Sequence, residues 1–214
     1  DSTWNYLRFD NARNPPGNDN WGIRNLTLVG LPTPTPTATP LVGGGLLAPG
    51  WNLVSVPEHP NDTSPAAVLS SIAGYYDLVY AYDASDQADP WKRFDPSAPS
   101  FANDLTVIDE TKGVWIHTTG AVTWMFPSST SPSSTTPLQE GWNLVGYPAL
   151  NAQPISDALA SVAGHYDLVY AYDAFDQTDP WKMYSPSAPP ETNDLTEMAP
   201  GRGYWIHATQ SGSW

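Results

Sequence analysis

The chain lacks features on which several classes of function depend. It has no cysteine and only four scattered histidines, which disfavours zinc sites and excludes disulfide scaffolds. Only 8 of its 214 residues are Lys or Arg, against 22 Asp or Glu, and the formal charge of −14 is unfavourable for contact with phosphate backbones. No run of 18 apolar residues occurs, so a membrane-spanning helix is not expected. We therefore expect neither a nucleic-acid partner nor a membrane span.

Proline and tryptophan, by contrast, are abundant. The chain contains 23 Pro, 16 Gly and 10 Trp, and 40% of its residues are apolar. This composition is not that of a helical bundle, but it suffices for hydrophobic cores in one or two domains. We expect many tight turns between short elements that carry large aromatic groups.

An internal repeat covers most of the chain. The motif Gly50–Val54 returns at Gly141–Val145, and the stretch from Gly74 to Pro99 is identical to its counterpart 90 residues later at 20 of 26 positions. Such identity indicates a recent duplication of a module of roughly 80 residues. Eight tryptophans form four equivalent pairs: Trp51 with Trp142, Trp91 with Trp181, Trp115 with Trp205, and Trp124 with Trp214. Both core packing and a duplicated binding surface explain this pairing.

Composition divides the chain into five segments. Residues 1–30 read as a strand pair, 31–45 as a Pro/Thr/Gly linker, 46–126 as module 1, 127–137 as a Ser/Thr/Pro linker and 138–214 as module 2. Dense Ser and Thr beside Pro are typical of O-glycosylated stalks, although an unmodified spacer fits equally well. The candidate O-glycosylation residues are Thr33, Thr35, Thr37, Thr39, Ser128, Thr130, Ser133 and Thr135, and the candidate N-glycosylation residues are Asn25 and Asn61.

The hydrophobic pattern of each module predicts short antiparallel strands with one short helix. Module 1 opens with a strand at Trp51, followed by a helix that Pro65 starts and Gly74 ends. Tyr76–Ala84 is the strongest strand, with Tyr76, Leu78, Tyr80 and Tyr82 expected on one face. Trp91–Phe94 is a further strand, and 114–118 with 122–126 predict a closing hairpin. The expected fold class is mainly β, as two small α+β modules of barrel-like or sandwich-like architecture.

Residues 1–30 present an assembly hypothesis. Two strands alone are marginally stable, so this pair needs another sheet, which a following module, another subunit or an upstream domain of which the pair is a remnant would supply. Donation of the strands to a like subunit would build a polymer by strand complementation.

The motifs Gly-Trp-Asn-Leu-Val, Tyr-Asp-Leu-Val-Tyr-Ala-Tyr-Asp and Gly-Tyr-Trp-Ile-His carry a resemblance over residues 50–126 and 141–214. The chain resembles a repeat module of secreted and cell-surface proteins of bacteria and archaea. The resemblance implies an extracellular or cell-surface location and modular use beside enzymes, adhesins or surface-layer-like proteins, and it implies no catalytic residues. Residues 1–30 are similar to the closing strands of a secreted carbohydrate-binding β-sandwich.

Two repeated loops are rich in aspartate. Their carboxylates are candidate calcium ligands, because Ca²⁺ prefers hard oxygen donors, but Asp side chains also cap turns and the spacing is not that of an EF-hand. The candidate ligands are Asp83, Asp86, Asp89, Asp173, Asp176 and Asp179. His117 and His207 are the first candidates for a general base, yet no nucleophile motif accompanies them. We interpret both histidines as structural, and expect no enzyme activity and no cofactor other than calcium.

Aromatic side chains on an exposed strand face would stack on sugar rings. The candidates are Tyr80, Tyr82, Trp91, Tyr170, Tyr172 and Trp181. The sequence thus leaves two functions open. The first is a non-enzymatic, extracellular structural or adhesive protein of a filamentous or cell-surface assembly, with like subunits or other surface proteins as partners. The alternative is a pair of accessory carbohydrate-binding modules of a secreted glycoside hydrolase, with polysaccharide as the partner.

Overall fold

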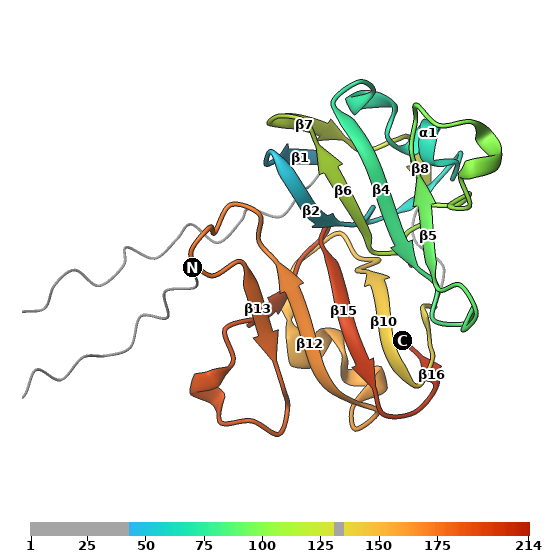
Figure 1. Ribbon diagram of the computed structural model, residues 1–214. Helices are drawn as coiled ribbons and strands as arrows, with labels where there is room; N and C mark the ends of the chain where they lie inside the picture. Colours follow the sequence, from blue (N-terminus) through green and yellow to red (C-terminus); the bar gives the residue numbers. More distant parts are fainter. Residues whose placement is uncertain (1–42, 131–134) are drawn as a thin grey trace, which may run out of the picture. The chain divides into compact units, whose positions relative to one another are not determined.

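The computed structural model describes residues 43–130 and 135–214, which build two similar halves within one compact unit (Figure 1). Strands account for 39% and helical turns for 12% of the structure, so the predicted mainly β fold class is confirmed. The sheets of the described part stay open, and none closes into a barrel. Within the described ranges, no helix has the length and apolar character to cross a membrane.

Module 1 is built on the four-stranded antiparallel sheet β2-β6-β4-β5. Its elements are β1 (Gly44–Leu47), β2 (Gly50–Val54), β3 (His59–Pro60), α1 (Pro65–Val68), the 3₁₀ turn η1 (Ser70–Ile72), β4 (Tyr76–Tyr82), β5 (Trp91–Phe94), η2 (Ser100–Ala102), β6 (Val114–Thr118) and β7 (Val122–Met125). The short strand β8 (Ser129–Thr130) follows in the linker and pairs with β3.

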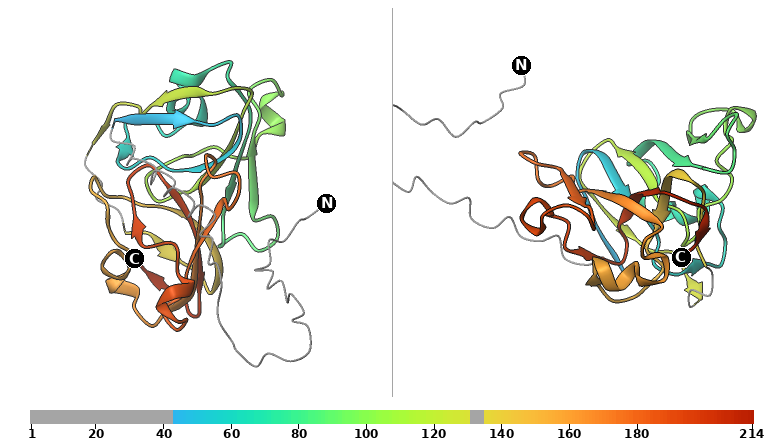
Figure 2. Two further views of the ribbon diagram at one scale, coloured as in Figure 1. Left: turned by 90° about the vertical axis from the view of Figure 1, so that its left-hand side faces the viewer. Right: turned by 90° about the horizontal axis from the view of Figure 1, so that it is seen from below.

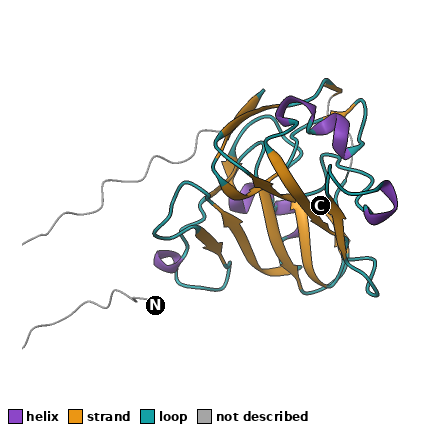
Figure 3. Cartoon of the chain, turned by 45° about the horizontal axis from the view of Figure 1, so that its top comes forward, coloured by secondary structure: helices purple, strands orange, loops and turns teal. Residues whose placement is uncertain are grey.

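Module 2 repeats this plan with the sheet β10-β15-β12-β13. The short strand β9 (Pro137–Leu138) begins at the end of the linker. The elements that follow are β10 (Gly141–Gly146), β11 (Gln153–Pro154), α2 (Ile155–Ala158), η3 (Ala160–Val162), β12 (Tyr166–Tyr172), β13 (Trp181–Tyr184), η4 (Pro190–Thr192), β14 (Glu197–Met198), β15 (Gly203–Ala208) and β16 (Gly212–Ser213). Figures 2 and 3 show the two sheets and the short helical segments from other sides.

Each module has its own hydrophobic core between one face of its sheet and the helical segment. Leu69 and Ile72 from this segment pack with Val79 and Ile116 of the sheet, and all four are fully buried. Burial of one such side chain contributes about 1.5–3 kcal/mol. The predicted start and end of the helical segment are confirmed, because Pro65 occupies its first turn and Gly74 follows it with φ +84°.

The predicted closing hairpin is wrong. β6 pairs with β2 and β4, whereas β7 leaves the sheet and pairs antiparallel with β1. The cause is Trp124 of β7, which is fully buried in the core and donates a hydrogen bond from Nε1 to the Val68 carbonyl oxygen at 3.1 Å. The helical segment and β1 thus hold β7 away from its neighbour in sequence.

The expected common face of the tyrosines in β4 is also corrected. A register shift between Tyr76 and Leu78 places Tyr76 in the core, where it is only 6% exposed, while Tyr80 and Tyr82 remain on the opposite face. A β-bulge of this kind adds one residue and reverses the alternation of faces. The extra residue is Asp77, which takes part in the candidate site described below.

The repeated motif Gly-Trp-Asn-Leu-Val assigns a different structural role to each residue. Gly50 has φ +90°, which a side chain would oppose. The buried amide of Asn52 closes the preceding turn, accepting from Ala48 N at 2.9 Å and donating to Ala48 O at 2.8 Å. Val54 enters the core, while Trp51 stays 38% exposed on the other face. The motif therefore starts the strand and aims one tryptophan outward.

The two modules contact each other through reciprocal backbone interactions. Ser55 N donates to Gly201 O at 3.0 Å, and the equivalent Gly146 N donates to Thr111 O at 3.0 Å. Isolated antiparallel bridges join Val54 to Arg202 and, equivalently, Val145 to Lys112. Because each contact recurs with the modules exchanged, the interface has the self-complementary character of a twofold dimer within one chain.

Glycines at the module boundary, among them Gly203 and Gly113, allow this close approach. A Cβ at Gly203 would lie 2.9 Å from Val54 O and 2.9 Å from Leu53 Cδ1, and a Cβ at Gly113 would lie 2.7 Å from Val145 O. All three distances are shorter than a carbon contact tolerates. Glycine at both positions lets the strand ends of one module abut those of the other.

Candidate functional site

One face of each four-stranded sheet carries a row of aromatic side chains. In module 1 the register places Trp115 opposite Tyr80, and Trp91 opposite Tyr82. Residues directly opposed in an antiparallel pair project from the same face, so these rings gather there. Module 2 repeats this arrangement. We name the combined surface the aromatic groove, and its residues are Trp51, Tyr80, Tyr82, Trp91, Trp115, Trp142, Tyr170, Tyr172, Trp181 and Trp205.

Neighbouring rings within one module lie close together, mostly in tilted or edge-to-face orientations. The ring centres of Tyr82 and Trp91 are 5.2 Å apart at 76°, and those of Tyr80 and Trp91 are 6.1 Å apart at 83°. Trp51 lies 6.0 Å from Tyr80. These are the geometries that aromatic quadrupoles favour, so the rings hold one another in place while exposing part of their surface.

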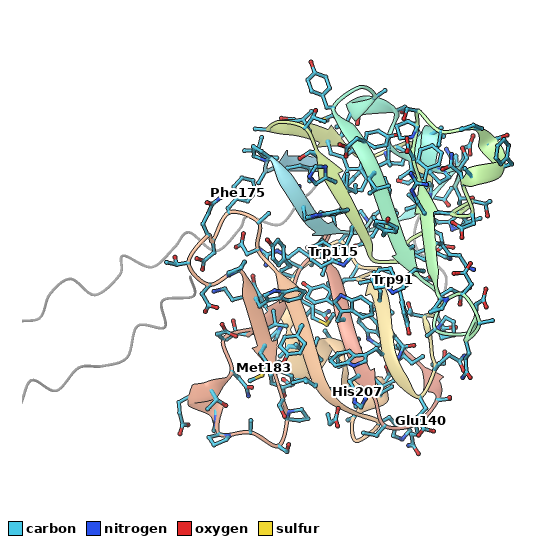
Figure 4. All side chains as sticks on the ribbon, in the orientation of Figure 1. Trp91, Trp115, Glu140, Phe175, Met183 and His207 are labelled. Atoms are coloured by element: carbon cyan, nitrogen blue, oxygen red, sulfur yellow. The ribbon has the colours of Figure 1, made fainter. Side chains whose placement is uncertain are left out.

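The groove is continuous across the module boundary. Trp205 of module 2 lies 5.2 Å from Tyr82 and 5.8 Å from Trp91, both of module 1. The reciprocal contacts join Trp115 to Tyr172 at 5.1 Å and to Trp181 at 5.8 Å. Figure 4 shows Trp91 and Trp115 where the two sheets meet. The centre of the groove therefore requires both modules.

Two hollows in the groove are lined by aromatic side chains alone. The larger, of about 640 Å³, is lined by Tyr82, Trp91, Trp142, Tyr170, Trp181 and Trp205. The smaller, of about 350 Å³, is lined by Trp51, Tyr80, Trp91, Trp115, Tyr172 and Trp181. Trp91 and Trp181 line both and remain 45% and 44% exposed, so they are the central rings available to a ligand.

A histidine held by an aspartate extends the aromatic row in each module. His117 Nδ1 lies 2.7 Å from Asp77 Oδ1, and His207 Nδ1 lies 2.7 Å from Asp167 Oδ1. His117 stands opposite Trp51 in the strand register, with ring centres 4.9 Å apart, and His207 repeats this 4.9 Å contact with Trp142. Each pair is partly exposed at the strand end remote from the module boundary.

The aspartate loops are organised by turn hydrogen bonds and one lysine each. Asp83 Oδ1 accepts from Ser85 N at 3.0 Å, and Asp86 Oδ2 accepts from Lys92 Nζ at 2.6 Å. The Asp86 carboxylate raises the pKa of Lys92. Among the described residues, no group of three His, Cys, Asp or Glu is arranged to hold a metal ion. Calcium binding by these loops stays a prediction.

The second loop buries its central aspartate more deeply than the first, with side-chain exposures of 10% for Asp176 and 40% for Asp86. Asp176 accepts from Lys182 Nζ at 2.9 Å and caps the backbone of Asp179. The Lys182 ammonium, followed by this backbone hydrogen bond, lowers the pKa of Asp176 to about 2. The carboxylate therefore already has a cationic partner within the protein.

The candidate glycosylation residues divide into two groups. Asn61, Ser128, Thr130 and Thr135 are exposed, and modification of these four stays a prediction. Asn25, Thr33, Thr35, Thr37, Thr39 and Ser133 lie outside the described residues, as does the strand pair predicted for 1–30.

All six aromatic residues singled out from the sequence lie in the groove, but four further tryptophans were missed. The repeat predicts that these four are equivalent in pairs but does not place them on this face: Trp51 with Trp142, and Trp115 with Trp205. The alternation of Trp115 and His117 around the buried Ile116 is the signal that indicates an exposed face.

Comparison with protein-family models, curated proteins and solved structures found no match.

Proposed function

We propose that this chain is a non-catalytic, extracellular carbohydrate-binding protein whose aromatic groove holds a polysaccharide chain. The observation that carries the proposal is the continuous row of ten partly exposed aromatic rings shared by two modules. Pyranose rings present apolar C–H faces, and Trp and Tyr offer large, rigid surfaces against which such faces pack.

The shape of the groove and the net charge of the chain support a long, uncharged ligand. The row of ring contacts runs from Trp51 through Trp91 to Trp142 and so crosses both modules. An elongated ligand would bury several rings at once, whereas a small molecule would fill one hollow only. The net charge of −14 opposes polyanions at low ionic strength.

The test is retention of the protein by immobilised or gel-embedded polysaccharides. Affinity electrophoresis with hydroxyethylcellulose, xylan and galactomannan, together with pull-down on cellulose and chitin, covers neutral chains of different shape. Trp91→Ala and Trp181→Ala each remove a central ring. Loss of about 1.5 kcal/mol of apolar burial corresponds to roughly tenfold weaker binding.

Phe101→Ala is the matched control. Phe101 is 89% exposed but lies outside the groove, in η2, so its removal should leave retention unchanged. Melting curves of all variants separate a binding effect from unfolding. The proposal fails if no polysaccharide retains the wild type, or if a proline-rich peptide binds instead and responds to the same two variants.

The assembly hypothesis depends on residues 1–30, which lie outside the described residues, and it stays a prediction. Light scattering at high protein concentration, together with micrographs of the native material, tests it independently of the groove.

A further inference from the structure

An Asp–His pair lies at each outer end of the aromatic groove. Each histidine uses Nδ1 to contact an aspartate oxygen at 2.7 Å, and its side chain is about one-third exposed. Within residues 43–130 and 135–214, Nε2 of these two histidines makes no hydrogen bond to a protein group. The second nitrogen of each ring is therefore available to a ligand.

The aspartate determines what this nitrogen offers. An ionised carboxylate only accepts hydrogen bonds, so the Nδ1 atom beside it must carry the proton. In a neutral imidazole the other nitrogen, Nε2, is then an acceptor with a free lone pair. Asp77 and Asp167 thus select the same tautomer at both ends, in the way that carboxylates beside metal-bound histidines fix the tautomer of those rings.

We propose that His117 and His207 bind hydroxyl groups of a neutral saccharide chain that lies along the aromatic groove, each accepting a hydrogen bond at Nε2. This inference rests on the proposed function and specifies its ligand. Packing against the aromatic rings is not directional. The two acceptors, by contrast, select ligands whose hydroxyl groups donate hydrogen bonds at both ends of the groove.

The same chemistry disfavours competing ligands. A proline-rich peptide offers few backbone N–H donors to these acceptors, because each proline residue lacks one. A uronic acid polymer would bring its carboxylates towards Asp77 and Asp167, and like charges placed together oppose binding. The expected ligand class is therefore a neutral polysaccharide long enough to span both modules.

Binding of hydroxyethylcellulose, xylan and galactomannan to the wild type and to His117→Ala, His207→Ala and the double variant tests the proposal at about pH 8. On the neutral polymer that the wild type binds best, each single variant should bind about 2–10-fold more weakly, as expected for one lost hydrogen bond. The two losses should agree within about twofold, and the double variant should show their product, because distant sites act additively. His165→Ala, a half-buried histidine away from the groove, should bind like the wild type.

Two further measurements distinguish hydrogen bonding from support of the neighbouring Trp51 and Trp142. Long-range ¹H–¹⁵N spectra should show the Nδ1–H tautomer for both histidines, and Asp77→Asn or Asp167→Asn should shift this equilibrium and weaken binding. Carboxymethylcellulose should bind more weakly than hydroxyethylcellulose, which has the same backbone without charge.

The outcomes separate the two proposals. If the wild type binds a neutral polymer but both histidine variants bind equally well, or if Nε2 carries the proton, this inference is overturned and the proposed function stands. If the wild type binds none of the polymers, the proposed function fails and this inference fails with it.

Discussion

Replacing Gly203 by Ala tests whether the contact between the modules organises the aromatic groove. The new Cβ would lie 2.9 Å from the backbone oxygen of Val54 and 2.9 Å from Leu53 Cδ1. A leucine terminus can rotate away, but the Val54 oxygen belongs to a strand end that is bridged to Arg202 and followed by the Ser55–Gly201 hydrogen bond. Relief of the clash with this oxygen therefore requires a backbone shift at the contact between the modules.

The expected cost follows from this geometry. Overpacking a tight contact destabilises a protein by about 1–3 kcal/mol, and each kcal/mol lowers the melting temperature of a protein of this size by about 2–4 °C. Gly113→Ala should behave alike, because its Cβ would lie 2.7 Å from Val145 O. Displacing the modules separates Trp91 from Trp205 and Trp115 from Trp181, so polysaccharide retention should fall as well.

Circular dichroism melts, tryptophan fluorescence and affinity electrophoresis measure these effects. Gly120→Ala is the matched control, because Gly120 lies outside the interface and a Cβ there meets nothing within 4 Å. Its melting temperature should stay within about 1 °C of the wild type, as is usual for an unconstrained surface position. Equal melting temperatures and equal retention for all three variants would refute the role assigned to the two interface glycines.

Three further predictions concern ionisable groups. The pKa of Asp176 is lowered to about 2, so its contribution to stability is present above the usual Asp pKa of about 4 and is lost as pH falls towards 2; urea unfolding should show Asp176→Asn less stable than wild type at pH 6, with the difference shrinking below pH 4. Burial raises the pKa of Tyr166 to about 12, so the free energy of unfolding should fall as pH rises from about 10 to 12, and the fall should be smaller in Tyr166→Phe. The fully buried Glu110 carboxylate contacts His59 Nδ1 at 2.7 Å, so His59→Ala should lower the free energy of unfolding by about 1–3 kcal/mol, whereas His165→Ala should not; equal stability of the two variants at pH 7 would contradict this.

The strands were predictable because their pattern is local. Alternation of apolar and polar residues from Trp51, across Tyr76–Ala84 and around Ile116 indicated strands that the structure contains. Proline and glycine likewise marked the ends of the helical segment. These signals depend on backbone conformation within a few residues, and both repeats carry them.

Pairings between distant segments were not predictable in this way. The partner of β7 depends on the burial of Trp124 under α1, and the face of Tyr76 depends on a bulge at Asp77. The sequence around Trp124 has the same alternation whether β7 pairs with β6 or with β1. The sequence around Asp77 likewise has the same alternation with or without a bulge. Only the competition between core volume and strand pairing selects one of them.

The duplication, the mainly β class and six of the ten groove residues follow from the amino-acid sequence, because identity between repeats and alternation along strands are properties of the chain itself. The joining of two modules into one groove does not. It arises where Gly113 and Gly203 let strand ends approach and where Trp91 meets Trp205. The contact of Asp77 with His117, 40 positions apart within module 1, likewise depends on the fold. All of these contacts join residues that are far apart in the chain, and those between Trp91 and Trp205 and at the two glycines form only because the modules pack about a common pseudo-twofold axis.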